Sequence, residues 1–422
     1  MTITSMSCSQ ALLAAAALSA LILQLLSYRR GEGYAIIEKQ QDDTTAAEAP
    51  RIRSRRLLNM GIELERTTFK LPYYLEQNLV NWDNLERSIE TKDTPIFWHV
   101  LKSGGSAIKL MYATCYGVTS ASETGEWIDR QQQQEQLQLE LEQQQQQHLQ
   151  RRQLQEEHDS QISPMEWVQK QMQEQWQVWE EPEETDDKQQ DLRIVVAEDG
   201  RKYVNVDVTT MEGIARASRL NFASSGLADI IFTPLLREGA EFLLDGDNHK
   251  GRMFAVFRSP VDRVVSLFYY LQQATWEPTY NPAFATMTID EYAYSQFCES
   301  NWMVRSIVNK MKGPLDPSDI SIAKEVIRQK CIIGLLDEMD ETIIRFHSFF
   351  GYENDDALTC ARQNFARAGG SQSNSHKHPK LDPNGETWQV IEQKNRLDIK
   401  LFEYAIELWH EQGEWMRNEN IL

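Results

Sequence analysis

The sequence predicts an α/β fold: a three-layer domain with a parallel sheet, preceded by an apolar N-terminal helix and interrupted by a low-complexity insertion. Short apolar runs alternate with longer segments of helical period after residue 94, as expected when strands alternate with helices. The length of 422 residues and the hydrophobic fraction of 41% provide enough apolar side chains for a large core. A Gln-rich segment divides this alternation, which indicates an insertion within the domain.

The expected strands are continuous apolar runs of four or five residues, which is typical of buried strands. They cover residues 96–100, 229–232, 253–257 and 332–336. Helical period is found at residues 106–116, 261–273, 289–308, 316–329 and 338–350, and in a last amphipathic segment at 387–415. We expect these helices to cover both faces of the sheet.

The N-terminal segment, residues 1–28, contains 18 consecutive residues without a charge at 11–28. As a helix this stretch would be about 27 Å long, enough to cross a bilayer. We therefore expect a signal-anchor or transmembrane helix, with a cleaved signal peptide as the competing interpretation. Basic residues follow the stretch and none precedes it, so the positive-inside rule favours a cytoplasmic location for the side that follows it. A simple anchor with a luminal domain would need the opposite orientation, and the orientation stays open. Residues 29–94 are expected to form a polar stem.

The domain expected over residues 95–422 is interrupted by a Gln/Glu-rich insertion at 130–191. Between residues 131 and 150, 12 of the 20 residues are Gln. Five leucines between residues 137 and 154 lack a heptad spacing, so no coiled-coil seam is defined. A solvated helix and a disordered segment are both compatible with this composition.

A Lys-Ser-Gly-Gly-Ser loop lies between the first predicted strand and the helix that follows it. It consists of Lys102, Ser103, Gly104, Gly105 and Ser106. The glycines permit a sharp turn and a close backbone approach to a ligand, and the helix N-terminus directs free N–H groups at an anion. With the lysine charge and two hydroxyls, the loop predicts a phosphate or sulfate cradle. The lysine precedes the glycines, so this is not a Walker A loop.

A second motif follows the predicted strand at 253–257. Arg258 ends that strand, Pro260 opens a helix where no N–H is lost, and Arg263 and Ser266 lie on the helix. A strand-end arginine and a serine on the next helix can hold a second phosphate through charge-assisted hydrogen bonds. The alternative is a structural arginine that is paired with Asp262.

Together the two motifs resemble those of the sulfotransferases that use 3′-phosphoadenosine 5′-phosphosulfate, especially the Golgi carbohydrate (heparan-sulfate-like) branch. In that family a Lys-Ser/Thr-Gly-Gly/Thr-Thr/Ser loop holds the 5′-phosphosulfate, and an Arg-x-Pro-x-x-Arg-x-x-Ser segment holds the 3′-phosphate. The similarity extends downstream at residues 301–305, 334–338 and 397–405. One departure is Leu101, where the family usually has Pro.

The resemblance implies a P-loop-like domain that transfers a sulfuryl group in line, without a metal, to a carbohydrate hydroxyl. By the match, Lys102 stabilises the charge on the leaving phosphate oxygen. The loop through Ser106 holds the 5′ end of the donor, and Arg258 and Ser266 hold its 3′-phosphate. The resemblance also implies a Golgi membrane protein with a luminal catalytic domain.

The match does not fix which residue removes the acceptor's proton, because family members use Glu or His at varying positions. Glu238, which follows the second predicted strand, is the first candidate. His99 and Glu123 come next.

Two rival functions fit parts of the sequence. Asp245-Gly-Asp247 matches the DxD pattern of metal-dependent Golgi glycosyltransferases, although with Asn248 it also has the composition of a turn. A non-catalytic interaction protein with a vestigial nucleotide fold is the second rival. The presence of Lys102, Arg258 and Ser266 argues against it.

The formal net charge of −20 argues against a nucleic-acid partner. An anionic donor must therefore be held by a local basic pocket, for which Lys102, Arg258 and Arg263 are expected to supply the charge. The sequence shows no basic groove for a polyanionic acceptor, so we expect a less charged glycan. Aromatic residues at 268–271 and 274–280 are candidates for a sugar site, although core packing is their commoner role.

The five cysteines are too scattered for a disulfide scaffold or a zinc site. In an oxidising lumen, Cys115, Cys298, Cys331 and Cys360 can pair in three ways, and buried free thiols are an equally compatible outcome. The sequence contains no Asn-x-Ser/Thr site.

Overall fold

The computed structural model describes residues 70–84, 93–159, 191–246, 249–277, 279–367 and 378–422. The chain divides into two units, Met1–Thr67 and Thr68–Leu422, and all described residues belong to the second. The predicted apolar helix at 11–28 and most of the stem lie outside the described residues. Among the described helices, none has both the length and the apolar character needed to cross a membrane.

The centre of the second unit is a seven-stranded sheet in the order β3-β4-β2-β5-β1-β6-β7. The strands are β1 (Thr94–Trp98), β2 (Ser120–Ala121), β3 (Ile194–Val196), β4 (Lys202–Val204), β5 (Ile230–Thr233), β6 (Gly251–Phe257) and β7 (Cys331–Leu335). All neighbouring strands are parallel except β3 and β4. The α/β prediction is confirmed, but the sheet is mixed, because the short link from β3 to β4 can join only antiparallel neighbours.

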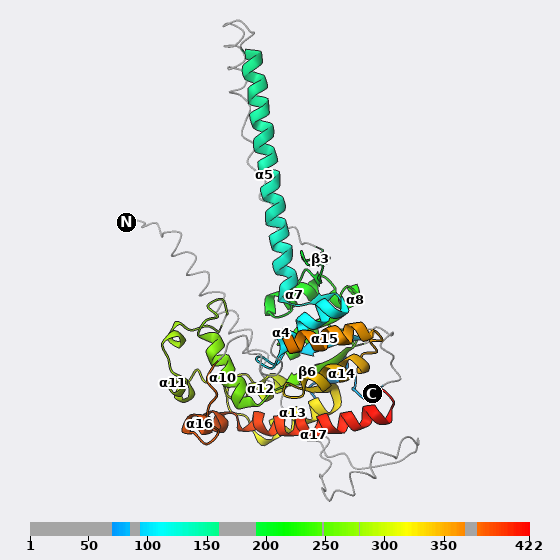
Figure 1. Ribbon diagram of the computed structural model, residues 1–422, viewed down its shortest axis with the longest axis vertical. Coiled ribbons are helices and arrows are strands. Elements are labelled where there is room, and N and C mark those ends of the chain that lie inside the picture. Colours follow the sequence, from blue (N-terminus) through cyan, green and yellow to red (C-terminus); the bar gives the residue numbers. More distant parts are fainter. Residues whose placement is uncertain (1–69, 85–92, 160–190, 247–248, 278, 368–377) are drawn as a thin grey trace, which may run out of the picture. The chain divides into compact units, whose positions relative to one another are not determined.

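Helices cover both faces of this sheet, as predicted (Figure 1). Alternate residues of β1 show the division, since Ile96 and Trp98 enter one core and Phe97 the other. The first core is covered by α3 (Tyr73–Asn78), α7 (Met211–Arg219), α8 (Phe222–Ser225), α9 (Leu236–Phe242), α12 (Trp302–Val308), α13 (Pro317–Lys330) and α17 (Arg396–Asn418). The second is covered by α4 (Gly105–Met111), the π-helical turn η2 (Tyr112–Tyr116), α14 (Met339–Phe349) and α15 (Asp355–Arg367).

A third hydrophobic cluster surrounds Phe268 of α10 (Pro260–Leu271). It includes residues of η3 (Pro282–Ala285), α11 (Ile289–Tyr294) and α16 (Glu386–Lys394). These elements lie together to one side of the sheet in Figure 1. The cluster supports α10, which carries the second predicted motif.

Two helices predicted as continuous are each divided in the structure. The segment at 289–308 forms α11 and α12, and the segment at 387–415 forms α16 and α17. The cause is a reciprocal pair of asparagines at the two breaks. The Asn301 backbone N–H donates to Asn395 Oδ1 at 2.9 Å, and Asn301 Oδ1 accepts from the Leu397 N–H at 2.8 Å. In both bonds the asparagine side chain accepts, and it replaces the backbone carbonyl acceptor of an uninterrupted helix.

The compact unit begins before residue 95, where the stem was expected to end. Leu75 and Leu79 are buried in the first core, and Leu79 forms a parallel bridge with Gly251. The Val80 N–H donates to the Gly251 carbonyl at 2.9 Å. Residues 70–84 therefore continue the sheet region rather than a polar stem.

The first part of the Gln-rich insertion is helical. Helix α5 (Glu123–Asp159) starts inside the domain, and almost every side chain from residue 131 to 150 is exposed. Gln136 and Gln138 donate to Glu140 and Glu142 one turn later, the spacing at which side chains on one helix face meet. The helix continues to residue 159 and its side chains are solvated up to residue 150, as the solvated-helix interpretation expects. Residues 160–190 lie outside the described part.

One disulfide joins η2 to α15, through Cys115 and Cys360. Cys298 and Cys331 are free and buried. The sequence left disulfide pairing and buried free thiols open, and the structure contains both.

Candidate functional site

The two predicted motifs meet at one edge of the sheet. Strands β1 and β6 are parallel neighbours, so the Lys102 loop and Arg258, which follow them, emerge side by side. The chain passes from β1 toward β2 on one side and from β5 across β1 to β6 on the other. Ligands of open α/β sheets bind at the carboxyl edge near such a reversal of strand order.

A hydrogen bond links the two motifs directly. Arg258 Nη1 donates to the Lys102 carbonyl oxygen at 3.0 Å. Burial, reinforced by the neighbouring Arg258 cation and opposed by Glu277, lowers the pKa of Lys102 to about 8. Burial also lowers the pKa of Arg258, while Asp262 and Asp337 oppose it. Two partly buried cations held together in this way favour an anion between or beside them.

The two glycines of the loop are required for different reasons. Gly104 has φ +85°, a left-handed conformation that glycine adopts without strain. Gly105 has no such φ, but a Cβ atom there would lie 2.1 Å from the His99 ring. The pair therefore brings the start of α4 into contact with the end of β1.

Several hydrogen-bond donors in this loop have no partner within the described structure. Ser103 is 1% exposed and its Oγ makes no hydrogen bond. The N–H groups of Gly104, Gly105 and Ser106 also have no acceptor among the described residues. Ser103 and Gly105 are buried, Gly104 is half-buried and Ser106 is exposed. Because buried polar groups are normally paired, the two buried members of this set fit an anionic oxygen-rich group such as a phosphosulfate.

Ser266 lies on the face of α10 that turns toward the two cations. Asp262 and Tyr270 are four residues before and after it, so the three side chains share one stripe of the helix. Asp262 interacts electrostatically with Arg258, and Lys102 Nζ lies 4.1 Å from the centroid of the Tyr270 ring. Ser266 sits between these contacts on the helix, and no hydrogen bond of its hydroxyl is found in the described part of the chain.

Arg263 does not belong to this basic pocket. Its side chain is 0% exposed and pairs with Glu299 and, at 3.8 Å, with Asp398. Its guanidinium also lies 5.5 Å from the Trp302 ring. The expectation that Arg263 supplies charge to a ligand is wrong, because its side chain is fully buried and is paired with one buried carboxylate, Asp398, and one partly exposed carboxylate, Glu299.

The three candidate bases have different surroundings. Glu238, in the first turn of α9, interacts with Tyr74, whose pKa is raised to about 12 by burial with a smaller contribution from Glu238. Burial, reinforced by Lys109, lowers the pKa of His99 to about 4, so its imidazole is neutral at neutral pH. Glu123 is paired with Lys109. Burial would raise its pKa, but the Lys109 charge and hydrogen bond lower it overall.

Sequence reasoning did not identify Glu277, whose carboxylate accepts a hydrogen bond from the Tyr270 hydroxyl. Tyr270 and Trp276 were named only within aromatic runs. The available signal was the spacing, because Tyr270 follows Ser266 by one helical turn. Nothing in the sequence pattern predicted that the turn after α10 would place the Glu277 carboxylate against the Tyr270 hydroxyl.

The DxD segment lies at the opposite edge of the sheet, before β6. Asp245 and His249 form an antiparallel bridge with hydrogen bonds of 2.9 and 2.7 Å, and Asp247 and Asn248 are outside the described residues. The described residues contain no group of three His, Cys, Asp or Glu side chains that could hold a metal ion. The turn interpretation of Asp245 is thus supported, and the metal interpretation of the full motif stays an untested alternative.

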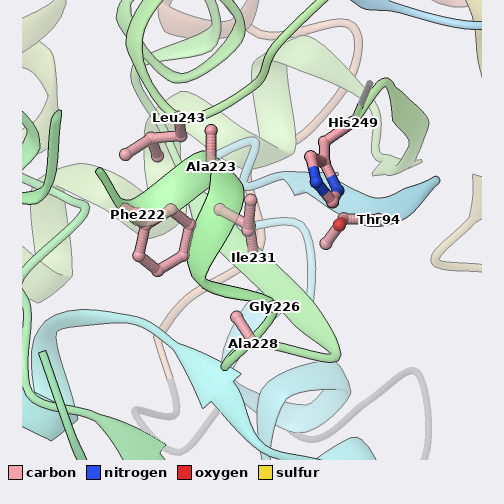
Figure 2. Close-up of a pocket in the computed structure, with 8 residues that line it drawn as sticks. All are labelled: Thr94, Phe222, Ala223, Gly226, Ala228, Ile231, Leu243 and His249. Carbon is pink, nitrogen blue, oxygen red and sulfur yellow. The ribbon is translucent and has the colours of Figure 1, made fainter. Parts of the chain in front are cut away.

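Figure 2 shows a pocket at that same opposite edge. It is lined by Thr94, Phe222, Ala223, Gly226, Ala228, Ile231, Leu243 and His249. Thr94 begins β1, and His249 precedes β6. The lining is mainly apolar and contains no lysine or arginine, so it does not suit the anion that the loop residues fit.

No protein-family model matches the chain, and no curated protein is significantly similar to it.

Proposed function

We propose that the chain is a sulfotransferase that moves a sulfuryl group from 3′-phosphoadenosine 5′-phosphosulfate to a hydroxyl of a carbohydrate. The observation that carries the proposal is the hydrogen bond between Arg258 and the Lys102 carbonyl, next to the unpartnered donors of the same loop. The resemblance of these two segments to the sulfotransferase motifs gives the anion its identity.

The donor-binding residues follow from this arrangement. Lys102, Ser103, Gly104, Gly105 and Ser106 would hold the 5′-phosphosulfate, and Arg258 and Ser266 the 3′-phosphate. When bound, the donor supplies an activated sulfuryl group on a phosphate leaving group. The Lys102 ammonium neutralises negative charge that develops on that phosphate oxygen, and partial burial makes this interaction stronger than in water. No metal ion is required for this role.

Among the candidate bases, the geometry favours Glu123 over Glu238. Glu123 interacts electrostatically with His99 and with Tyr270, whose ring contacts Lys102. The described electrostatic contact of Glu238 is with Tyr74, on another helix. The lowered pKa values of His99, at about 4, and of Glu123 make both groups weak bases at neutral pH. The choice of Glu123 therefore rests on its position beside Tyr270. Glu123→Gln should lower kcat by about 10²–10⁴-fold with little change in donor affinity.

The compartment is part of the proposal. The disulfide between Cys115 and Cys360 joins positions 245 residues apart, and such bridges persist in oxidising compartments. Together with the apolar stretch at 11–28, this supports a Golgi membrane protein whose catalytic domain is luminal.

The test is transfer of ³⁵S from the labelled donor to a panel of glycans. Lys102→Ala should abolish transfer without unfolding the protein, and Arg258→Ala should mainly raise the KM for the donor. Lys310→Ala and Arg362→Ala are matched controls, because both side chains form surface ion pairs and should leave the rate unchanged.

Three outcomes would contradict the proposal. Wild-type rates in both site variants would refute the site assignment. Binding of 3′-phosphoadenosine 5′-phosphate without any transfer would support the non-catalytic alternative. Mn²⁺-dependent turnover of a nucleotide sugar would support the glycosyltransferase alternative.

A further inference from the structure

Next to Lys102 the structure exposes a large aromatic side chain. Trp276 is 72% exposed, although aromatic side chains usually contribute to cores and interfaces. Its position is fixed by the backbone, because the Glu277 N–H donates to Ala274 at 3.1 Å and the Tyr280 N–H to Glu277 at 2.9 Å. Ala274 is fully buried. The turn therefore holds the indole outward, which suits a surface that meets a ligand.

Trp276 forms one continuous surface with two other residues. Its ring lies edge-to-face with Tyr270, with 6.4 Å between centroids and 80° between planes. The Tyr270 hydroxyl donates to Glu277, and the Tyr270 ring contacts the Lys102 ammonium. We call Tyr270, Trp276 and Glu277 the aromatic platform. It connects the proposed reacting centre at Lys102 to solvent.

The chemistry of the aromatic platform matches a sugar ring without charge. An indole face packs against the C–H face of a pyranose, and tyrosine and tryptophan combine an apolar body with a polar tip. A carboxylate accepts hydrogen bonds from ring hydroxyls. Glu277 and the nearby Glu123, which also interacts with Tyr270, would repel a uronate or sulfate group. The neighbouring cations, Lys102 and Arg258, are assigned to the donor.

We propose that the aromatic platform is the acceptor subsite and that it binds an uncharged sugar ring with one hydroxyl directed toward Lys102. This inference rests on the proposed sulfotransferase function and adds the class of acceptor to it.

The experiment measures transfer to uncharged trisaccharides (cellotriose, xylotriose, chitotriose and galactotriose) and to acidic trigalacturonate. Trp276→Ala should raise the KM for an accepted uncharged sugar about tenfold or more, and Trp276→Phe should restore part of this loss. Glu277→Gln should reduce the ratio of kcat/KM for uncharged acceptors to kcat/KM for the acidic acceptor. Tyr73→Ala removes another exposed aromatic side chain, on α3, and should change nothing.

The affinity for 3′-phosphoadenosine 5′-phosphate, measured by calorimetry, distinguishes a failure of the acceptor subsite from a failure of the proposed sulfotransferase function. It should stay within twofold of wild type in the Trp276 variants. The subsite proposal would be overturned if Trp276→Ala transferred normally with an unchanged acceptor KM. It would also be overturned if the wild-type protein preferred trigalacturonate to the uncharged sugars. Transfer to a tyrosine peptide but to none of the sugars would do the same. Absence of nucleotide binding would overturn the proposed function, and the subsite with it.

Discussion

If Lys102 holds the proposed donor, the affinity for that donor should depend on pH by a calculable amount. With a pKa of about 8, about ten in eleven of the Lys102 side chains are cationic at pH 7 and about one in eleven at pH 9. Only the cation attracts the phosphate, so the association constant should fall by up to about tenfold over this range. The sign follows from the lysine, which loses its charge as the pH rises through its pKa.

The assay is calorimetric titration with 3′-phosphoadenosine 5′-phosphate from pH 7 to pH 9.5 at constant ionic strength. The nucleotide phosphates have second pKa values near 6, so their charge is almost constant in this range. Lys102→Arg keeps its charge and should bind with nearly constant affinity through pH 9. Arg258→Gln removes a neighbouring cation that lowers the pKa of Lys102, so the fall should move to higher pH.

A second buried lysine makes the arginine variant a necessary control. Burial lowers the pKa of Lys330 to about 8 as well, and its ammonium donates to the Leu79 carbonyl at 2.9 Å. A decrease in nucleotide affinity at high pH that was caused by Lys330 would persist in Lys102→Arg. The reasoning is refuted if that variant shows the same fall as wild type, or if the wild-type affinity is constant from pH 7 to pH 9.

Three further predictions concern packing around the site. Gly105→Ala would place a Cβ 2.1 Å from His99, and calorimetry should show at least about tenfold weaker nucleotide binding. Asp398→Ala would remove the buried carboxylate that pairs with Arg263 and accepts from the Met303 and Val304 N–H groups, leaving Arg263 only Glu299, and urea unfolding should show a loss of about 3–5 kcal/mol. Cys360→Ala opens the bridge to Cys115 and should cost about 2–5 kcal/mol; reductant should then lower the Tm of wild type but not of the variant.

The sequence was sufficient for the central strands and for bringing the two motifs together. Strands β5, β6 and β7 are buried at every residue, so their apolar runs are continuous and easily recognised. Because parallel strands end at one edge, placing the Lys102 loop after one strand and Arg258 after another already predicted that they would meet.

Other features depend on contacts between distant segments and leave no local pattern. Strand β2 has two residues, and β3 and β4 have three each, too few for a period to show. The breaks at Asn301 and Asn395 require each other, since each side chain serves the other segment. The burial of Arg263 and the return of Glu277 to Tyr270 are likewise tertiary effects that helical spacing does not contain.

The base of α5 bears on how the Gln-rich segment is accommodated. Ile128 packs with Val195, Asp129 accepts from Arg193, and Gln132 donates to the Val196 carbonyl at 2.9 Å. The segments of chain that enter and leave the insertion are thus joined at its base, within its first three residues. The insertion beyond these contacts can lengthen or shorten without moving the sheet, because loop-closure entropy grows only slowly with length. The length of the segment can therefore change in evolution without altering the sheet edge that carries Lys102 and Arg258.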